Sequence, residues 1–176
     1  YDTAHRTCEQ AVALYDHLAI LLHLLREALH LCSPHGRLRT QAQVRSELLS
    51  LFEMIEALDC VALRKTLQSI RTHLDDILVP FKHAESIDAA LRTMVPHEAL
   101  DFLVLAWHHA HFVHQSGSKK KGYHHRERDF WLACAEGLLG DAFDTLNALV
   151  VDKLDSIVRA SSLVEMVNGL LRPSLN

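Results

Sequence analysis

The sequence predicts an all-α protein, an array of about seven or eight helices that lie mostly antiparallel. Six glycines and four prolines stand among 176 residues, about half of the ~12% share that is usual in globular proteins. Apolar residues recur at helical spacing along most of the chain, and no sustained run alternates β-branched with polar residues. A β-sandwich or barrel needs a turn about every 8–12 residues and is therefore not expected.

Composition narrows the class of protein further. With 49% hydrophobic residues, 23% charged residues and a net charge of -4, the chain is expected to fold as one domain rather than to be disordered. No apolar run approaches the ~18 residues of a membrane-spanning helix, so no membrane partner is expected. The widely spaced cysteines indicate reduced thiols in a cytoplasmic protein. They are Cys8, Cys32, Cys60 and Cys134.

The first two helices follow from their apolar stripes. Leucines between Leu14 and Leu29 recur at i, i+4 and i+7, and the pattern ends in a turn over Ser33–Gly36. A second helix is predicted from about Thr40 to Leu58, because Val44 and the apolar residues after it share one side.

The middle of the chain is divided by its prolines and polar caps. Asp59 offers an N-cap for a third helix, from about Val61 to Val79, which Pro80 is expected to end. A short helix is predicted over Ser86–Met94. Pro96 then stands at the start of the next helix, where proline is favoured.

The last helices are separated by glycine-containing breaks. One helix is predicted from Pro96 to about Gln115, and it ends in the clearest loop of the chain, Ser116–Gly122. Further helices are expected over about Arg126–Leu139, Asp141–Ile157 and Ser161–Leu171.

Fourteen histidines are present, and they are densest between His108 and His125. His111 and His114 lie three residues apart on one helical face, a spacing that can share a metal, and His124 or His125 could complete a zinc site. No cysteine or carboxylate stands at a companion position in the same turns, and the H-E-x-x-H pattern is absent. Structural or surface histidines are therefore favoured, with a zinc site as the alternative.

One basic concentration stands out in an otherwise acidic chain. Lysines on a loop of small residues suit contact with phosphates, and Tyr123 could stack on a base. The alternative is a solvated loop without a partner. The basic residues are Lys119, Lys120, Lys121, Arg126 and Arg128.

The C-terminal segment carries a polar stripe on an apolar helix. Glu165, Asn168 and Arg172 fall at i, i+3 and i+7, which places them within about 60° of one another on one helical face. Such a stripe indicates either a functional site or an ordinary solvent-exposed helix face.

This segment, SSLVEMVN followed by LRPSLN over residues 161–176, resembles the end of the catalytic region of bacterial insertion-sequence transposases of the DDE class. In that family, which has a ribonuclease-H-like core, a Glu in such a helix closes an Asp-Asp-Glu triad and is followed by Asn and Arg-Pro. Segments at 14–18, 36–39 and 105–107 are similar to the helical insertion that precedes this Glu, and Tyr1–His5 is similar to the family's Asp-x-x-His element. The resemblance covers nearly the whole chain and is most specific at its end.

The resemblance implies cutting and joining of DNA by phosphoryl transfer with two Mg²⁺ ions. It matches Glu165 with the catalytic, metal-binding carboxylate, and Asn168 and Arg172 with the polar positions that would contact DNA. The basic residues from Lys119 to Arg128 would then contact the DNA backbone, and a homo-oligomer in a transposition complex is possible. In related transposases an aromatic residue of the insertion can hold a flipped base, which makes Trp107 and Trp131 candidates although neither matches a motif. Their helical positions are more typical of a core.

The chain also departs from the family's pattern. The strands that carry the first two Asp of the triad are not found, and Asp2 is not assigned as a ligand. Since one carboxylate cannot hold two Mg²⁺ ions, the chain is expected to be inactive alone. Residues 1–158 are interpreted as a helical insertion and residues 159–176 as the Glu-bearing helix of an incomplete core. The alternative is a stand-alone helical module that binds DNA or protein without catalysis.

Overall fold

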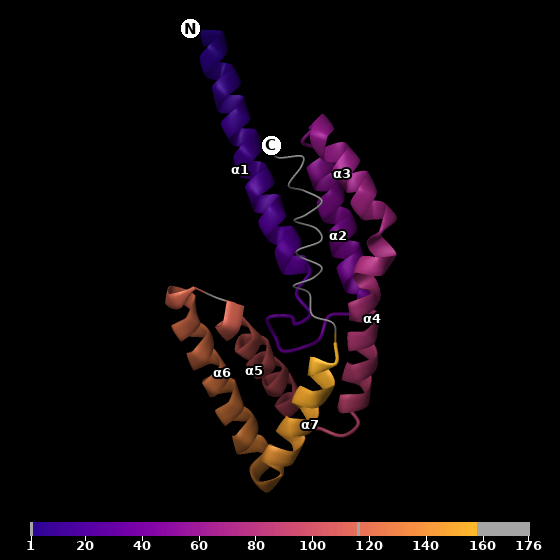
Figure 1. Ribbon diagram of the computed structural model, residues 1–176, viewed down its shortest axis with the longest axis vertical. Coiled ribbons are helices and arrows are strands. Elements are labelled where there is room, and N and C mark those ends of the chain that lie inside the picture. The colour runs from indigo at the N-terminus through magenta and orange to yellow at the C-terminus, as the bar shows by residue number, and fades with distance from the viewer. Residues whose placement is uncertain (1, 116, 158–176) are drawn as a thin grey trace. The chain divides into compact units, whose positions relative to one another are not determined.

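The computed structural model describes residues 2–115 and 117–157, and it confirms the all-α prediction (Figure 1). These residues contain no β-strand, only an isolated antiparallel bridge between Cys32 and Leu38. The elements in chain order are α1 (Asp2–Ala28), α2 (Gln41–Glu56), α3 (Val61–Thr72), α4 (Leu74–Leu91), α5 (His97–Gln115), α6 (Ser118–Leu139), the 3₁₀ turn η1 (Gly140–Ala142) and α7 (Phe143–Asp155).

The number of helical segments is smaller than predicted. Only His73 separates α3 from α4, so the two form one bent segment. Counted in this way, the described residues contain six helical segments rather than seven or eight. The helix predicted over Ser161–Leu171 lies outside the described residues.

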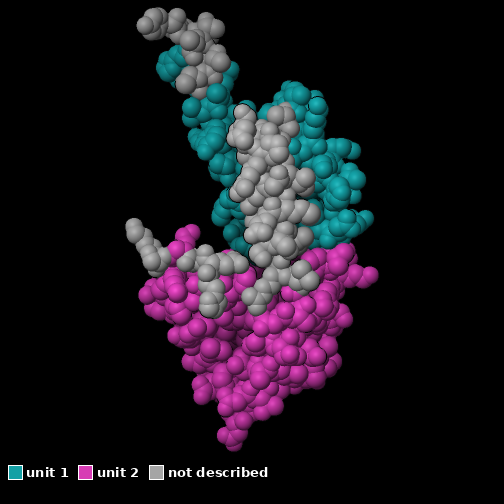
Figure 2. All heavy atoms as spheres, in the orientation of Figure 1, with its two compact units in different colours: residues 1–30, 42–78, 160–176 teal, residues 31–41, 79–159 magenta. Residues whose placement is uncertain are grey.

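The described residues group into two compact units, although the chain length alone suggests one domain (Figure 2). Residues 2–30 and 42–78 belong to unit 1, and residues 31–41 and 79–157 belong to unit 2. The chain therefore passes from one unit to the other more than once.

Unit 1 is built around the predicted apolar face of α2. Five residues of that face are buried: Val44, Leu48, Leu51, Phe52 and Ile55. Arg71 of α3 lies over the Phe52 ring, with its guanidinium carbon 5.5 Å from the ring centroid, and pairs with Glu56 at 3.1 Å. The apolar stripe predicted for the first helix is also buried in part, at Leu18, Leu21, Leu25 and Leu29.

Two predicted helix boundaries in this region are wrong. Pro80 does not end a helix but lies inside α4, and the interruption falls at His73, whose φ of −102° and ψ of 13° leave the helical region. Proline usually ends a helix because it lacks a backbone N–H and its ring crowds the carbonyl four residues earlier, but α4 continues through Pro80. Asp59 is not the N-cap of α3, because Cys60 holds that position; Asp59 has a φ of 54° and pairs with Arg64.

Unit 2 contains α5, which packs against both α6 and α7. The predicted apolar face of α5 is buried at Leu100, Leu103, Val104 and Trp107. The indole Nε1 of Trp107 donates a hydrogen bond to Asp155 of α7 at 2.9 Å, while Trp131 of α6 stacks on Phe102 at 5.4 Å between ring centroids. The prediction that Trp107 belongs to the core is confirmed. Among the described helices, none combines the length and the apolar character needed to cross a membrane.

Candidate functional site

The predicted site residues fall into two groups. Glu165, Asn168 and Arg172 lie outside the described residues. The basic residues lie at the beginning of α6, in unit 2.

The prediction of a loop over Ser116–Gly122 is wrong for residues 118–122, which belong to α6; Ser116 lies outside the described residues. Gly117 is the N-cap of α6, and its carbonyl accepts hydrogen bonds from the backbone N–H groups of Lys120 and Lys121, each at 3.1 Å. Lysine is a good helix former, which helps to explain why the helix includes these residues. Their charges therefore lie at a helix N-terminus, where the helix dipole adds further positive potential.

The basic side chains differ in how far they are exposed to solvent and in whether an acidic neighbour pairs with them. Lys120, Lys121 and Arg126 are exposed, whereas the side chain of Lys119 is not described. Arg128 is half-buried, and its Nε and an amino nitrogen donate to Asp129 at 2.8 and 2.6 Å. The charge of Arg128 is thus partly offset by its neighbour, and the accessible positive charge lies in the first turns of α6.

Two histidines meet where α6 packs on α5. Nδ1 of His109 lies 2.9 Å from Nδ1 of His124, and the two ring centroids are 5.2 Å apart. Phe112 stacks on His124 at 5.2 Å, and Tyr123 contacts both imidazoles edge-on, at 5.9 Å from His109 and 5.2 Å from His124. Tyr123 keeps 49% of its surface exposed. It lies among the first turns of α6, which carry Lys120, Lys121 and Arg126 and are called the basic turns below.

The surroundings favour the neutral form of both imidazoles. Burial lowers the pKa of His109, and the neighbouring His124 lowers it further. Burial also lowers the pKa of His124, and the charge of Lys120 adds to this effect. Glu127 acts against both shifts. In the neutral pair one Nδ1–H donates and the other Nδ1 accepts.

The predicted zinc site, at His111 and His114 with His124 or His125, lies only partly within the described side chains. In the part of the chain that the structure describes, no three histidine, cysteine or carboxylate side chains converge on a common metal position. His111 instead contacts the Phe112 ring at 5.9 Å between centroids, and the side chain of His114 is not described.

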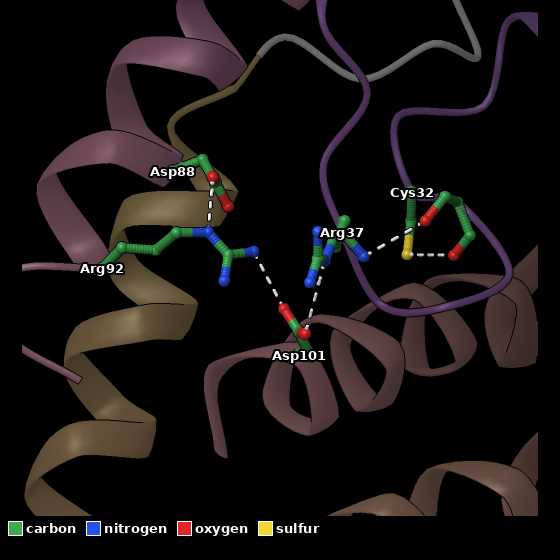
Figure 3. A network of polar contacts seen from close by, with 6 residues as sticks. Cys32, Arg37, Asp88, Arg92 and Asp101 are labelled. Atoms are coloured by element: carbon green, nitrogen blue, oxygen red, sulfur yellow. Dashed lines mark hydrogen bonds and ion pairs between the residues drawn. The ribbon is translucent and has the colours of Figure 1, made fainter. Parts of the chain in front are cut away.

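A second polar network, not predicted from the sequence, lies in the same unit (Figure 3). Arg92, the first residue after α4, pairs with Asp88 of α4 at 2.7 Å and with Asp101 of α5 at 2.8 Å. Asp101 also pairs with Arg37 of the 31–41 loop at 3.7 Å. Asp88 and Arg92 stand four residues apart, the spacing of a helical ion pair, which was the available signal. The network fastens the loop to two helices.

Cys32 adjoins this network without being a reactive thiol. Its Sγ donates to the Ser33 carbonyl at 3.1 Å, and burial together with Asp101 raises its pKa to about 12. A thiol that stays protonated is a poor nucleophile and a poor metal ligand. We therefore interpret the network as structural.

The start of α6 is the described surface best suited to a ligand. Exposed lysines, a helix N-terminus and an exposed tyrosine together fit a polyanion that carries stacked bases. A scan against models of protein families and searches of curated proteins and of solved structures found no match to this chain.

Proposed function

We propose that this chain is the helical insertion and the Glu-bearing segment of a DDE-class transposase, which contributes to metal-dependent DNA cleavage and transfer in the complete, cytoplasmic enzyme. The run from Ser161 to Asn176 carries the proposal, because it holds Glu165, Asn168 and Arg172 in the order in which the family has them. The helical fold of residues 2–115 and 117–157 is in keeping with a helical insertion.

The residue types of the run suit this chemistry. Two Mg²⁺ ions supply, when bound, the charge that activates the attacking oxygen and stabilises the leaving oxygen. Glu165 offers the oxygen ligands that such hard cations prefer, and two Asp of a ribonuclease-H-like core must supply the others. Arg172, about two turns after Glu165, would bind a phosphate of the substrate strand with its planar guanidinium.

The exposed start of α6 supports a contact with the DNA backbone. Lys120, Lys121 and Arg126 would bind phosphates regardless of base sequence. Tyr123 would add a stacking surface for a base, and this contact does not depend on which base is present. These residues would position DNA, whereas Glu165 would take part in the chemical step.

The catalytic part of the proposal is tested by replacing the carboxylate. Residues 1–176 are joined to a core that supplies two strand-borne aspartates, and Mg²⁺-dependent cleavage of the element's DNA ends is followed on a denaturing gel. We expect Glu165→Gln to abolish cleavage, because a neutral amide cannot replace a charged metal ligand. Glu136→Gln, an exposed position on α6, is the matched control and should keep activity. Full activity of Glu165→Gln would contradict the assignment.

A second candidate is a helical module that binds DNA without catalysis. The observation in its favour is that the basic turns of α6 are exposed and need no carboxylate to bind phosphates. The two candidates share the DNA contact and differ in whether Glu165 matters.

The shared DNA contact is tested on the 176-residue chain itself. Fluorescence anisotropy with a labelled duplex, measured over a series of salt concentrations, gives the slope of log affinity against log salt. We expect Lys120→Ala with Lys121→Ala to weaken binding and to reduce the slope by about two, because each phosphate contact contributes about 0.9. Lys82→Ala with Lys153→Ala, two exposed lysines on α4 and α7, is the control. If the basic turns are not the contact, both double variants will behave alike.

A further inference from the structure

We infer that the His109–His124 pair couples DNA binding at the start of α6 to the uptake of one proton, so that binding strengthens as the pH falls. The inference rests on the proposed DNA contact and adds its regulation by pH. Three observations carry it: the direct contact of the two imidazoles, the position of Lys120 beside them, and their partial burial.

The geometry of the pair suits one extra proton but not two. With 2.9 Å between the two Nδ1 atoms, the neutral pair shares a single Nδ1–H. A proton added to the outer Nε2 of the donor ring leaves this hydrogen bond in place and makes it charge-assisted. A second added proton would turn both Nδ1–H groups toward each other, and the hydrogen bond would be lost.

The charged groups that face the pair determine the pH at which it takes up that proton. On α6, Lys120 opposes a positive charge on His124, and Glu127 favours one on both rings. On α5, His108 packs edge-on against His109 at 5.6 Å between centroids. Burial and Lys120 together keep the pair mostly without its extra proton at neutral pH.

A bound phosphate changes this balance. His124 lies four residues after Lys120, so that the two side chains project from one side of α6 in successive turns. A phosphate on Lys120 offsets the lysine charge and adds negative charge near His124, and the pair then takes up a proton from the solvent. Because coupling between two ligands is reciprocal, a proton that binds better in the presence of DNA must also tighten DNA binding.

Calorimetry of the whole chain with a duplex of about 20 base pairs measures this coupling directly. Titrations at pH 7.5, 6.8 and 6.0, at constant ionic strength and in two buffers of different ionisation enthalpy, give both the affinity and the number of protons taken up. We expect the affinity of the wild type to rise about three- to tenfold per pH unit, since uptake of one proton corresponds to tenfold.

Two variants and one control show whether His109 and His124 are responsible for the proton uptake. His124→Gln and His109→Gln each keep a polar side chain at the contact but remove an imidazole, and we expect most of the proton uptake to be lost in both. His97→Gln removes an exposed histidine at the start of α5, and it should keep the wild-type proton uptake. Circular dichroism establishes that each variant remains helical.

A measurement on the unaltered chain does not depend on the variants. Titration of the imidazole proton resonances by NMR, with and without duplex, should show the pKa of His109 or His124 rising when DNA is bound. DNA binding with unchanged resonance titrations, or with the same proton uptake in His124→Gln, overturns the inference and leaves the proposed function standing. A wild-type chain that binds no duplex at any of the three pH values contradicts the proposed function, and the inference falls with it.

Discussion

Gly36 occupies a place in the 31–41 loop that only a residue without a side chain can fill. Its φ is +78°, and a Cβ at this position would lie 2.2 Å from the backbone carbonyl oxygen of Asp101 on α5. The side chain of the same Asp101 pairs with Arg92 and Arg37. One turn of α5, at Asp101, therefore makes both the close backbone contact with Gly36 and the ion pair with the 31–41 loop.

We expect Gly36→Ala to lower the free energy of unfolding by about 2–4 kcal/mol, because the methyl group meets backbone and the left-handed conformation becomes strained. Urea denaturation followed by circular dichroism measures the change. Gly137→Ala is the matched control, since a Cβ there meets nothing within 4 Å, and it should raise stability by about 0.5–1 kcal/mol as expected within a helix. Equal effects of the two substitutions would show that the close approach to Asp101 does not matter.

Single residues differ in how far the sequence predicts their role. The turn at Ser33–Gly36 was predictable, because proline and glycine interrupt helical patterns wherever the fold places them. The partners of Arg92 were only half predictable. Asp88 lies four residues earlier, at the end of α4, but Asp101 belongs to α5, and its approach to Arg92 depends on how the connection after α4 turns.

Helices were predicted more reliably than their ends. The apolar faces of α2 and α5 are buried as their periodicity predicts, since burial of such a face is what stabilises a helix. The predictions at Pro80 and at the lysines of α6 are wrong for different reasons. A single breaker residue can be overridden by tertiary context, as at Pro80, whereas the exposed lysines are themselves good helix formers. The interruption at His73 could not be predicted, because no proline or glycine stands between Val61 and His73.

The contact between α5 and α6 should make stability depend on pH. Free histidine has a pKa of about 6.5, and the pKa values of His109 and His124 are lower in the folded protein. As the pH falls below about 6.5, the unfolded chain takes up protons first, so the free energy of unfolding decreases. The decrease continues for as long as the unfolded chain binds more protons on these two residues than the folded pair does.

Urea denaturation at pH 8.0 and pH 5.5 measures this dependence. We expect the wild type to lose stability between the two values, and the double variant His109→Gln with His124→Gln to lose less. His97→Gln, which removes an exposed histidine, should behave as the wild type does. A double variant with the full wild-type dependence would assign the effect to other groups.

At the scale of the molecule, the helices group into the two units nearly in chain order, but the connection between α1 and α2 does not follow that order. Residues 31–41 belong to unit 2, although residues on both sides of them belong to unit 1. Periodicity identifies each helix but not which helices share a core, because that depends on contacts between distant segments. The grouping of the basic residues was easier to predict, since they lie within ten residues of one another on α6. The His109–His124 contact was not predicted, because it depends on how α5 and α6 pack.

The fourteen histidines make the net charge of the whole chain sensitive to pH near neutrality. With histidines counted as neutral, the net charge is -4 at pH 7. The sequence has an isoelectric point of about 6.4, which lies in the range of pH where histidine changes its charge. We therefore expect the electrophoretic mobility of the chain to change sign between about pH 7 and pH 6.

This change of sign would act on DNA binding together with the local effect of the His109–His124 pair. Above the crossing, the proposed DNA contact at the basic turns of α6 would form against the overall negative charge of the chain. Below it, the whole molecule attracts the phosphates as well. Electrophoretic mobility measured in steps from pH 7.5 to pH 6.0 locates the crossing without any DNA present. A chain that remains negative at pH 6.0 would mean that most of its histidines are held neutral by the fold, and the strengthening of DNA binding would then have to come from the pair alone.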